Sequence, residues 1–223
     1  GGIIHKSTMS SGKNNSSVLE NYNVITIGDS VVGKTSMLMA FTEGTFPIHH
    51  MSTLGIDTSS KAVTIKKNKQ VKLTLWDTAG QERVRSITTN YYKSSDAIVL
   101  VYDCKQRDTF ESISSWMTQI EEHASKDVFK VIVANKIDLD DQVIDKTEGE
   151  SLAKKYGCPF FETSAKTGQN IDELFKFVAT HVVSSNLFVK KKESNKKDGR
   201  FTLDSFNNEG RKMRRKGWLR KLC

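Results

Sequence analysis

The sequence contains no long hydrophobic run. Its longest uncharged apolar stretch covers residues 97–102, whereas a helix needs about 20 apolar residues to cross a bilayer. No apolar stretch near the first residue has the features of a signal peptide. We therefore expect neither a membrane-spanning protein nor a translocated one.

Cysteines are also few, and their spacing excludes two classes of site. Cys104, Cys158 and Cys223 match neither a disulfide framework nor a metal-ligand pattern. Cys104 and Cys158 flank apolar segments, and free cysteine behaves as a small buried hydrophobic residue. We expect both to be reduced core residues in a cytoplasmic protein.

The positive charge is confined to one end of the chain. The total is +8, but residues 190–223 hold 13 Lys or Arg against 4 Asp or Glu, so the rest of the chain carries a net −1. A basic arm of this kind binds nucleic acid or an anionic membrane surface. Because few aromatic residues that could stack on bases are interleaved with the basic ones, nucleic-acid binding is not expected.

Hydrophobic periodicity predicts alternating strands and helices. Residues 97–102 and 128–134 are nearly continuous apolar runs, as expected for parallel strands covered on both faces. Apolar residues alternate on both sides of Lys67-Asn68-Lys69, which predicts a β-hairpin. Together these patterns predict an α/β doubly wound sheet of six strands, mixed because of one antiparallel edge strand, with about five flanking helices.

Two segments carry apolar residues at i, i+3, i+4 and i+7, which is the spacing of one helix face. They are Ile113, Trp116, Met117 and Ile120, and then Ile171, Leu174, Phe175 and Val178. This periodicity favours core packing for Trp116 over a binding role.

The string GDSVVGKT at residues 28–35 matches the phosphate-loop pattern between a predicted strand and a predicted helix. Lys34 is predicted to reach the β- and γ-phosphates, and the Thr35 hydroxyl to ligate Mg²⁺. The predicted nucleotide-binding residues here are Asp29, Ser30, Val31, Val32, Gly33, Lys34, Thr35 and Ser36. Val31 is β-branched and resists positive φ, so we expect negative φ at this position or, failing that, weaker nucleotide binding.

Three further strings follow predicted strands. In WDTAGQE (residues 76–82), Asp77 is placed to hold Mg²⁺, the Gly80 N–H to approach the γ-phosphate and Gln81 to orient the attacking water. In NKID, the Asp138 carboxylate can accept two hydrogens from guanine, whereas adenine presents an acceptor at N1. The remaining predicted nucleotide-binding residues of NKID and TSAK are Lys136, Ser164, Ala165 and Lys166, together with Asn135, which is expected to brace the loop.

In this order the four strings resemble a small GTPase of the Ras superfamily, a P-loop NTPase, over roughly residues 21–183. WDTAGQER, Tyr91-Tyr92-Lys93 and LVYD at residues 100–103 are similar to Rab signatures. The resemblance implies a GTP- and GDP-regulated switch in vesicle trafficking that hydrolyses GTP with Mg²⁺. It also implies that Thr53 contacts Mg²⁺ and γ-phosphate and that Phe46 packs on guanine, with Gln81, Lys34 and Thr53 as the catalytic set. A nucleotide-locked scaffold that does not cycle remains the alternative.

The resemblance also implies partners: an activating protein, an exchange factor, effectors and a GDP-dissociation inhibitor. Candidate partner contacts are Ile56, Trp76 and Tyr91. Relatives carry an aromatic residue at the position of Thr58, so the usual effector set is in question. Ordinary packing on the hairpin is the alternative role for Trp76 and Tyr91.

Finally, the sequence divides into a disordered segment at residues 1–20, a GTPase domain at 21–185 and a basic hypervariable tail at 186–223. Relatives carry geranylgeranyl groups on C-terminal cysteines, and here only Cys223 stands at the end. Either Cys223 takes one lipid, or the chain is truncated, or anchoring is atypical. One lipid chain binds a membrane only marginally, and the basic arm would supply the second signal. We expect a peripheral protein on the cytosolic face of intracellular membranes, with a solvated tail or nuclear signal as the alternative.

Overall fold

The computed structural model describes residues 19–47, 53, 55–78, 91–140 and 142–197, with the side chains of 67 and 187–197 left aside. The chain falls into two compact units that divide after Thr180, and each is described by itself. Gly80, Gln81 and Cys223, together with most of the predicted N-terminal segment and basic tail, lie outside the described residues.

Six strands form one sheet, β1 (Asn21–Ile27), β2 (Ile56–Thr64), β3 (Gln70–Thr78), β4 (Ala97–Asp103), β5 (Phe129–Asn135) and β6 (Phe160–Thr163). Their order is β2-β3-β1-β4-β5-β6. Only the β2–β3 pair is antiparallel, and the other pairs are parallel. Every residue of the central strand β4 is buried, as its continuous apolar run predicts. The predicted mixed sheet with one antiparallel edge strand is confirmed.

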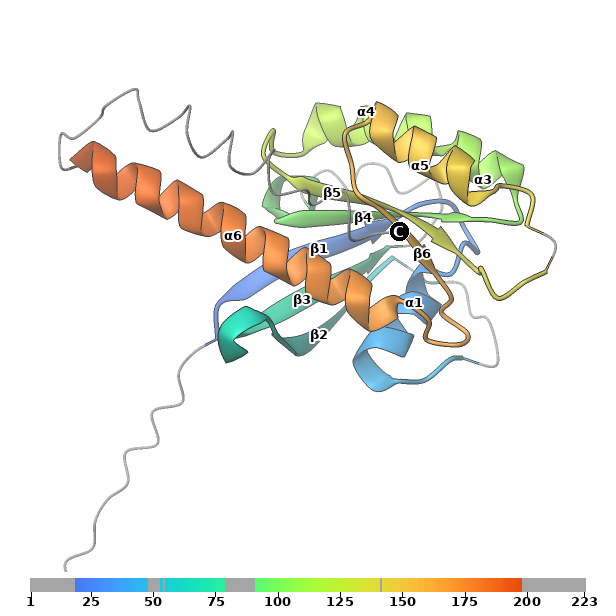
Figure 1. Ribbon diagram of the computed structural model, residues 1–223, viewed down its shortest axis with the longest axis horizontal. Helices are drawn as coiled ribbons and strands as arrows, with labels where there is room; N and C mark the ends of the chain where they lie inside the picture. Colours follow the sequence, from blue (N-terminus) through green and yellow to red (C-terminus); the bar gives the residue numbers. More distant parts are fainter. Residues whose placement is uncertain (1–18, 48–52, 54, 79–90, 141, 198–223) are drawn as a thin grey trace, which may run out of the picture. The chain divides into compact units, whose positions relative to one another are not determined.

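Five α-helices accompany this sheet in the described residues: α1 (Lys34–Glu43), α3 (Arg107–Glu111), α4 (Ile113–His123), α5 (Lys146–Lys155) and α6 (Ile171–Lys197). A short 3₁₀ turn, η1 (Lys66–Asn68), joins β2 to β3. Figure 1 shows α3, α4 and α5 together on one face of the sheet and α1 on the other. Helix α6 continues past residue 185, so helical backbone extends into the first residues of the predicted tail.

Alternating residues of the parallel strands build a core on each face. On one face Ile98, Leu100 and Tyr102 pack with Ile113 and Met117 in a single buried cluster. On the other, Phe41 of α1 stacks on Phe175 at the start of α6, with ring centroids 4.2 Å apart. Both predicted helical stripes are therefore buried as expected, except that Trp116 is only half-buried.

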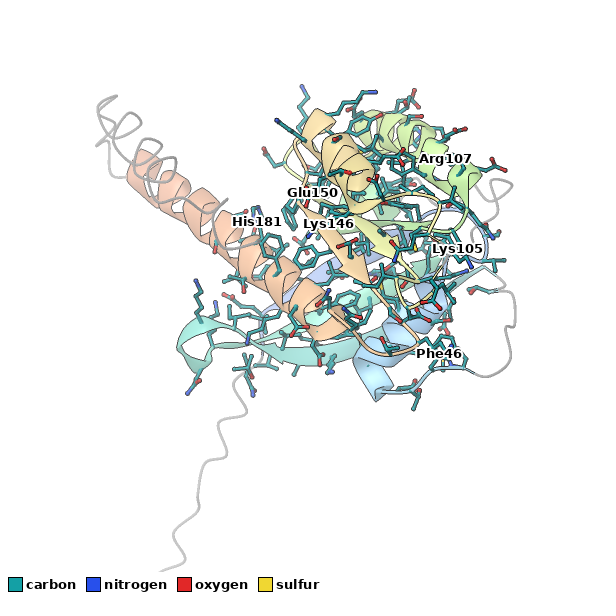
Figure 2. The ribbon with its side chains drawn as sticks, turned by 45° about the vertical axis from the view of Figure 1, so that its right-hand side comes forward. Phe46, Lys105, Arg107, Lys146, Glu150 and His181 are labelled. Carbon is teal, nitrogen blue, oxygen red and sulfur yellow. The ribbon has the colours of Figure 1, made fainter. Side chains whose placement is uncertain are left out.

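One ion pair fastens the surface helices to each other. Arg107 of α3, labelled in Figure 2, donates two hydrogen bonds to the Glu148 carboxylate of α5, at 2.6 and 3.0 Å. Bidentate pairs of this kind fix orientation as well as distance.

Within the described residues, no helix is both long enough and apolar enough for a membrane span.

Parallel strands bring their carboxyl ends to one edge of the sheet. Asp103, Asn135 and Thr163 end three adjacent strands and lie side by side in register. β1 ends at Ile27, immediately before the phosphate loop. Ligands of open α/β sheets bind at this edge, which is why motifs far apart in the sequence can form one site.

Candidate functional site

The phosphate loop wraps around the ammonium group of Lys34. Lys34 Nζ donates to the carbonyl oxygens of Gly28, at 2.9 Å, and Asp29, at 2.7 Å. Burial lowers the Lys34 pKa to about 8, while the charges of Asp77 and Asp29 oppose that shift. A buried cation at the N-terminus of α1 suits an anionic ligand, because the helix start adds free N–H groups and a positive dipole end.

Glycine is required at two points of this loop. Gly28 has φ +138°, and a Cβ there would lie 2.1 Å from the Val101 carbonyl oxygen. Gly33 has φ +98°, and a Cβ there would lie 2.4 Å from Asn135 Nδ2. The two motif glycines therefore permit the loop to touch β4 and the end of β5.

The expectation of negative φ at Val31 is wrong. Val31 has φ +65°, and its side chain is 64% exposed. The backbone around Lys34 takes the left-handed region at this residue, most of which is exposed to solvent. A β-branched residue in this region carries strain of about 1–3 kcal/mol.

The three predicted metal ligands meet at one point beside the phosphate loop. Thr35 Oγ1 lies 2.6 Å from Asp77 Oδ2 and 2.8 Å from Thr53 Oγ1. Burial raises the Asp77 pKa, against the opposing effects of the Thr35 hydrogen bond and the Lys34 charge. Asp77 Oδ1 is buried and has no hydrogen-bond partner among the residues that the structure describes. Hard oxygen donors and one unsatisfied carboxylate oxygen fit Mg²⁺.

Buried Asn135 connects three segments at the other end of the site. Its Nδ2 donates to the Val32 carbonyl oxygen at 2.9 Å. Its Oδ1 accepts from the Ala165 N–H and from Thr163 Oγ1, both at 3.2 Å. The amide thus holds the phosphate loop and the predicted base-binding loops in one arrangement.

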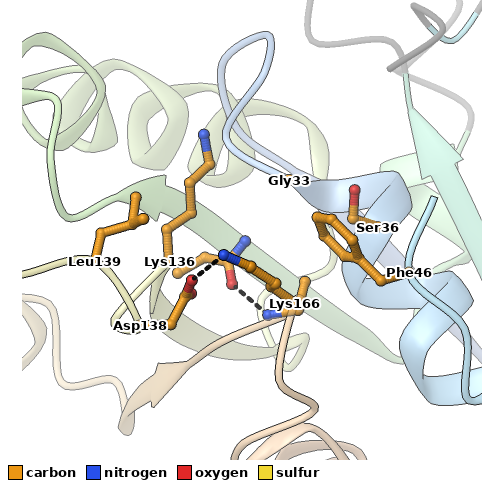
Figure 3. A pocket seen from close by; sticks show the side chains of 9 residues that line it. Gly33, Ser36, Phe46, Lys136, Asp138, Leu139 and Lys166 are labelled. Atoms are coloured by element: carbon orange, nitrogen blue, oxygen red, sulfur yellow. Dashed lines mark hydrogen bonds and ion pairs between the residues drawn. The ribbon is translucent and has the colours of Figure 1, made fainter. Parts of the chain in front are cut away.

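The residues predicted in NKID and TSAK, except Ser164, line one pocket, which Figure 3 shows from close by. Ser164 Oγ donates to Asp138 Oδ1 at 2.6 Å, and Lys166 Nζ lies 3.9 Å from Asp138 Oδ2. Across the pocket, Phe46 is 37% exposed. The lining comprises Gly33, Ser36, Phe46, Asn135, Lys136, Asp138, Leu139, Ala165 and Lys166.

Three contributors to this site are absent from the sequence-based prediction. Leu139 lines the pocket directly after NKID. Buried Asp103, the last residue of LVYD, pairs with Lys136, whose Nζ lies 2.7 Å from its carboxylate. Trp116 packs on the core cluster as predicted, but its Nε1 also donates to Asp29 Oδ1 at 2.8 Å. Periodicity cannot reveal that bond, because the partners are 87 residues apart.

The predicted partner contacts lie near the antiparallel edge of the sheet. Ile56 begins β2 and is half-buried. Thr58 is exposed and pairs with Trp76 across β2 and β3. The Trp76 ring lies 4.9 Å from that of Tyr91, centroid to centroid. Trp76 and Tyr91 therefore do contact each other. At position 58, opposite Trp76, the side chain is a threonine and not an aromatic ring.

A doubly wound sheet with a phosphate loop, a Thr–Asp cluster and a carboxylate-bearing pocket defines a nucleotide-binding P-loop protein. The Ras family profile matches residues 23–184. The chain is 44% identical over 161 residues to Ras-related protein RABE1e of Arabidopsis thaliana, covering 71% of this chain and 73% of that one. It is 46% identical over 160 residues to Rab-26 of Mus musculus (71% and 61%) and 41% over 162 residues to Rab-1D of Dictyostelium discoideum (72% and 79%).

The chain belongs to the Rab family of small GTPases. It is a Rab-like switch that hydrolyses GTP and acts in vesicle trafficking. Binding of GTP and GDP belongs to the family as a whole.

The position of Asp138 in the pocket generates a test of base recognition. Asp138→Asn is expected to lower GTP affinity roughly a hundredfold or more, because a donor replaces an acceptor opposite the guanine N1–H. Xanthine nucleotides, which present an oxygen where guanine has its 2-amino group, should gain affinity. Calorimetry with GTP and xanthosine triphosphate in magnesium measures both effects, with the exposed-site variant Lys154→Ala as control. Unchanged GTP affinity in Asp138→Asn would remove Asp138 from the base site.

Proposed function

We propose that GTP or GDP binds along the carboxyl edge of the sheet, phosphates at the loop around Lys34 and guanine in the pocket beside Asp138. The observation that carries this proposal is the pairing of two clusters through Asn135. Lys34, Thr35, Thr53 and Asp77 gather at one end, and Asp138, Ala165 and Lys166 at the other.

Mg²⁺ would be held by Thr35, Thr53 and Asp77, and when bound it neutralises charge on the β- and γ-phosphate oxygens. The hydroxyls of Thr35 and Thr53 would then turn from Asp77 toward the ligand. Support comes from their convergence on one carboxylate oxygen, within 3.4 Å, while the other oxygen has no partner in the described part of the chain.

At the base, the Asp138 carboxylate would accept two hydrogens from guanine and the Ala165 N–H would approach O6. Lys136, held by Asp103, would lay its apolar stem along the ring, with Lys166 and Phe46 bordering the purine. Lys166 Nζ lies 3.9 Å from Asp138 Oδ2, which is a weak ion pair. Lys166 would therefore leave Asp138 and contact the ligand when nucleotide binds.

Hydrolysis would proceed by in-line attack of a water oriented by Gln81. Lys34 and the N–H groups of the phosphate loop would stabilise charge on the transferring group. No arginine in the sequence stands where it would serve as an internal finger, so the missing charge would come from an activating protein.

The purified protein is therefore expected to turn over slowly, on the order of 10⁻⁴ s⁻¹. A matching activating protein should accelerate phosphate release by several orders of magnitude, and Gln81→Leu should abolish that acceleration while GTP remains bound. Single-turnover phosphate release measures both. Turnover of several per second by the protein alone would contradict the mechanism. Failure to release phosphate with any activating protein would favour a nucleotide-locked scaffold, which the strained loop at Val31 leaves open.

We also propose that Ile56, Trp76 and Tyr91 contact effectors. Trp76 and Tyr91 are half-buried, so each keeps surface for a partner beyond their mutual contact. Aromatic side chains dominate binding energy at protein interfaces. Thr58 beside Trp76 would leave room for a larger side chain of the partner.

Trp76→Ala is expected to weaken GTP-dependent partner binding about thirtyfold or more, in line with truncation of an interface tryptophan. The measurement is quantitative mass spectrometry of proteins retained from a cell extract by the GTP-loaded but not the GDP-loaded chain. GDP affinity is checked on the same samples, and Lys154→Ala serves as control. An unaltered GTP-dependent set would assign Trp76 to packing alone.

The basic tail at residues 186–223 would hold the protein on an anionic membrane, together with a prenyl group on Cys223. Each Lys or Arg near such a surface contributes about 1 kcal/mol, so the 13 basic residues from Lys190 onward would supply the second signal that a single lipid chain needs, even if half of them engage. Trp218, Leu219 and Leu222 would seat at the headgroups. Residues 1–20 and 21–185 would be the disordered segment and the GTPase domain.

Geranylgeranylated protein is expected to co-sediment with vesicles that contain phosphatidylserine, and less as salt rises. Cys223→Ser should lose most of that binding because it removes the lipid but not the charge. Strong salt-dependent RNA binding without vesicle binding would reverse this assignment.

A further inference from the structure

One side chain of helix α4 reaches the phosphate loop. Trp116 Nε1 donates to Asp29 Oδ1 at 2.8 Å. The Trp116 ring packs against the core cluster, and this packing fixes the position of the indole N–H. Phenylalanine would fill a similar apolar volume, which leaves the N–H as the feature specific to tryptophan. A hydrogen bond to a carboxylate is also stronger than one between neutral groups.

Among the described residues, this bond is one of two external hydrogen bonds that hold the loop on either side of Val31. The second runs from Asn135 Nδ2 to the Val32 carbonyl oxygen at 2.9 Å. Between the two held residues lie Ser30 and Val31, both exposed. Val31 has φ +65°, a conformation that its branched side chain resists. The strained step is therefore flanked by an external hydrogen bond on each side.

The Asp29 bond also bears on Lys34. The carbonyl of Asp29 accepts from Lys34 Nζ at 2.7 Å, so the position of Asp29 helps to set the position of the ammonium group. A shift of Asp29 would move one of the two carbonyl oxygens that orient Lys34.

We propose that Trp116 is a positioning residue of the nucleotide site: its indole N–H holds Asp29, and through Asp29 the phosphate loop, in the ligand-binding conformation against the strain at Val31. This inference rests on the nucleotide site proposed above. It assigns Trp116 a role beyond core packing, and it makes nucleotide release depend on a helix that contributes no residue to the pocket lining.

The experiment is a double-mutant cycle read as the GDP release rate, measured by chase of a fluorescent GDP analogue in magnesium. Trp116→Phe keeps the ring packing and removes the donor, and it is expected to speed release roughly tenfold or more. Asp29→Ala removes the acceptor, so adding Trp116→Phe to it should have no further effect. Asp29→Asn keeps an acceptor oxygen, so Trp116→Phe should still accelerate release in that background.

Two further measurements separate positioning from general loss of packing. The indole ¹H–¹⁵N signal of Trp116 should shift in Asp29→Ala, as loss of its hydrogen bond requires. Val31→Gly removes the strain and should reduce the effect of Trp116→Phe on release. Phe110→Leu, which trims a half-buried ring on the same core cluster, is the packing control: it should lower thermal stability without speeding release.

The outcomes distinguish this inference from the proposed function. If the wild-type chain binds GDP and Trp116→Phe releases it at the wild-type rate, Trp116 has no positioning role. Equal acceleration by Trp116→Phe in the wild-type and Asp29→Ala backgrounds also overturns the inference, because the effect would then be packing. A wild-type chain that binds no GDP would overturn the nucleotide site and this inference together.

Discussion

The site depends above all on the buried side-chain amide of Asn135. One amide donates to the phosphate loop and accepts from the loop after β6, so segments separated by more than a hundred residues share one set of hydrogen bonds. A buried amide without these partners would cost free energy of folding. Neither loop would then be held in position by Asn135. The close approach also explains Gly33, since any Cβ there would strike Asn135 Nδ2. Loop geometry and base pocket are therefore one structural unit.

Desolvation sets the electrostatics of the phosphate end. Burial lowers the pKa of Lys34 and raises that of Asp77, so both groups lie in surroundings that disfavour their charged forms. A polyphosphate would stabilise charged Lys34, and a divalent cation would stabilise charged Asp77. The two charges that the binding loop needs are thus better satisfied with ligand than without it.

Two departures from the family pattern have different physical consequences. Val31 places strain in the backbone of the phosphate loop, where the left-handed conformation is required by the path around Lys34. Thr58 changes no backbone geometry, but it replaces a ring by a small polar side chain beside Trp76. The first departure acts on how the loop holds its ligand, and the second on which surface a partner meets. External support of the loop at Asp29 and Val32 is consistent with a strained step between them.

The sequence by itself determined the sheet, both buried helical stripes, the phosphate loop and the base-reading motifs, because each depends on periodicity or spacing within a short segment. Local patterns failed at Val31, where propensity argued for negative φ and the closed path of the loop required the opposite. They could not show that Asp103 supports Lys136, that Leu139 lines the pocket, or that Trp116 reaches Asp29. Only the tertiary structure decided these contacts, because they join residues that are distant along the chain and become neighbours when parallel strands place their carboxyl ends at a common edge.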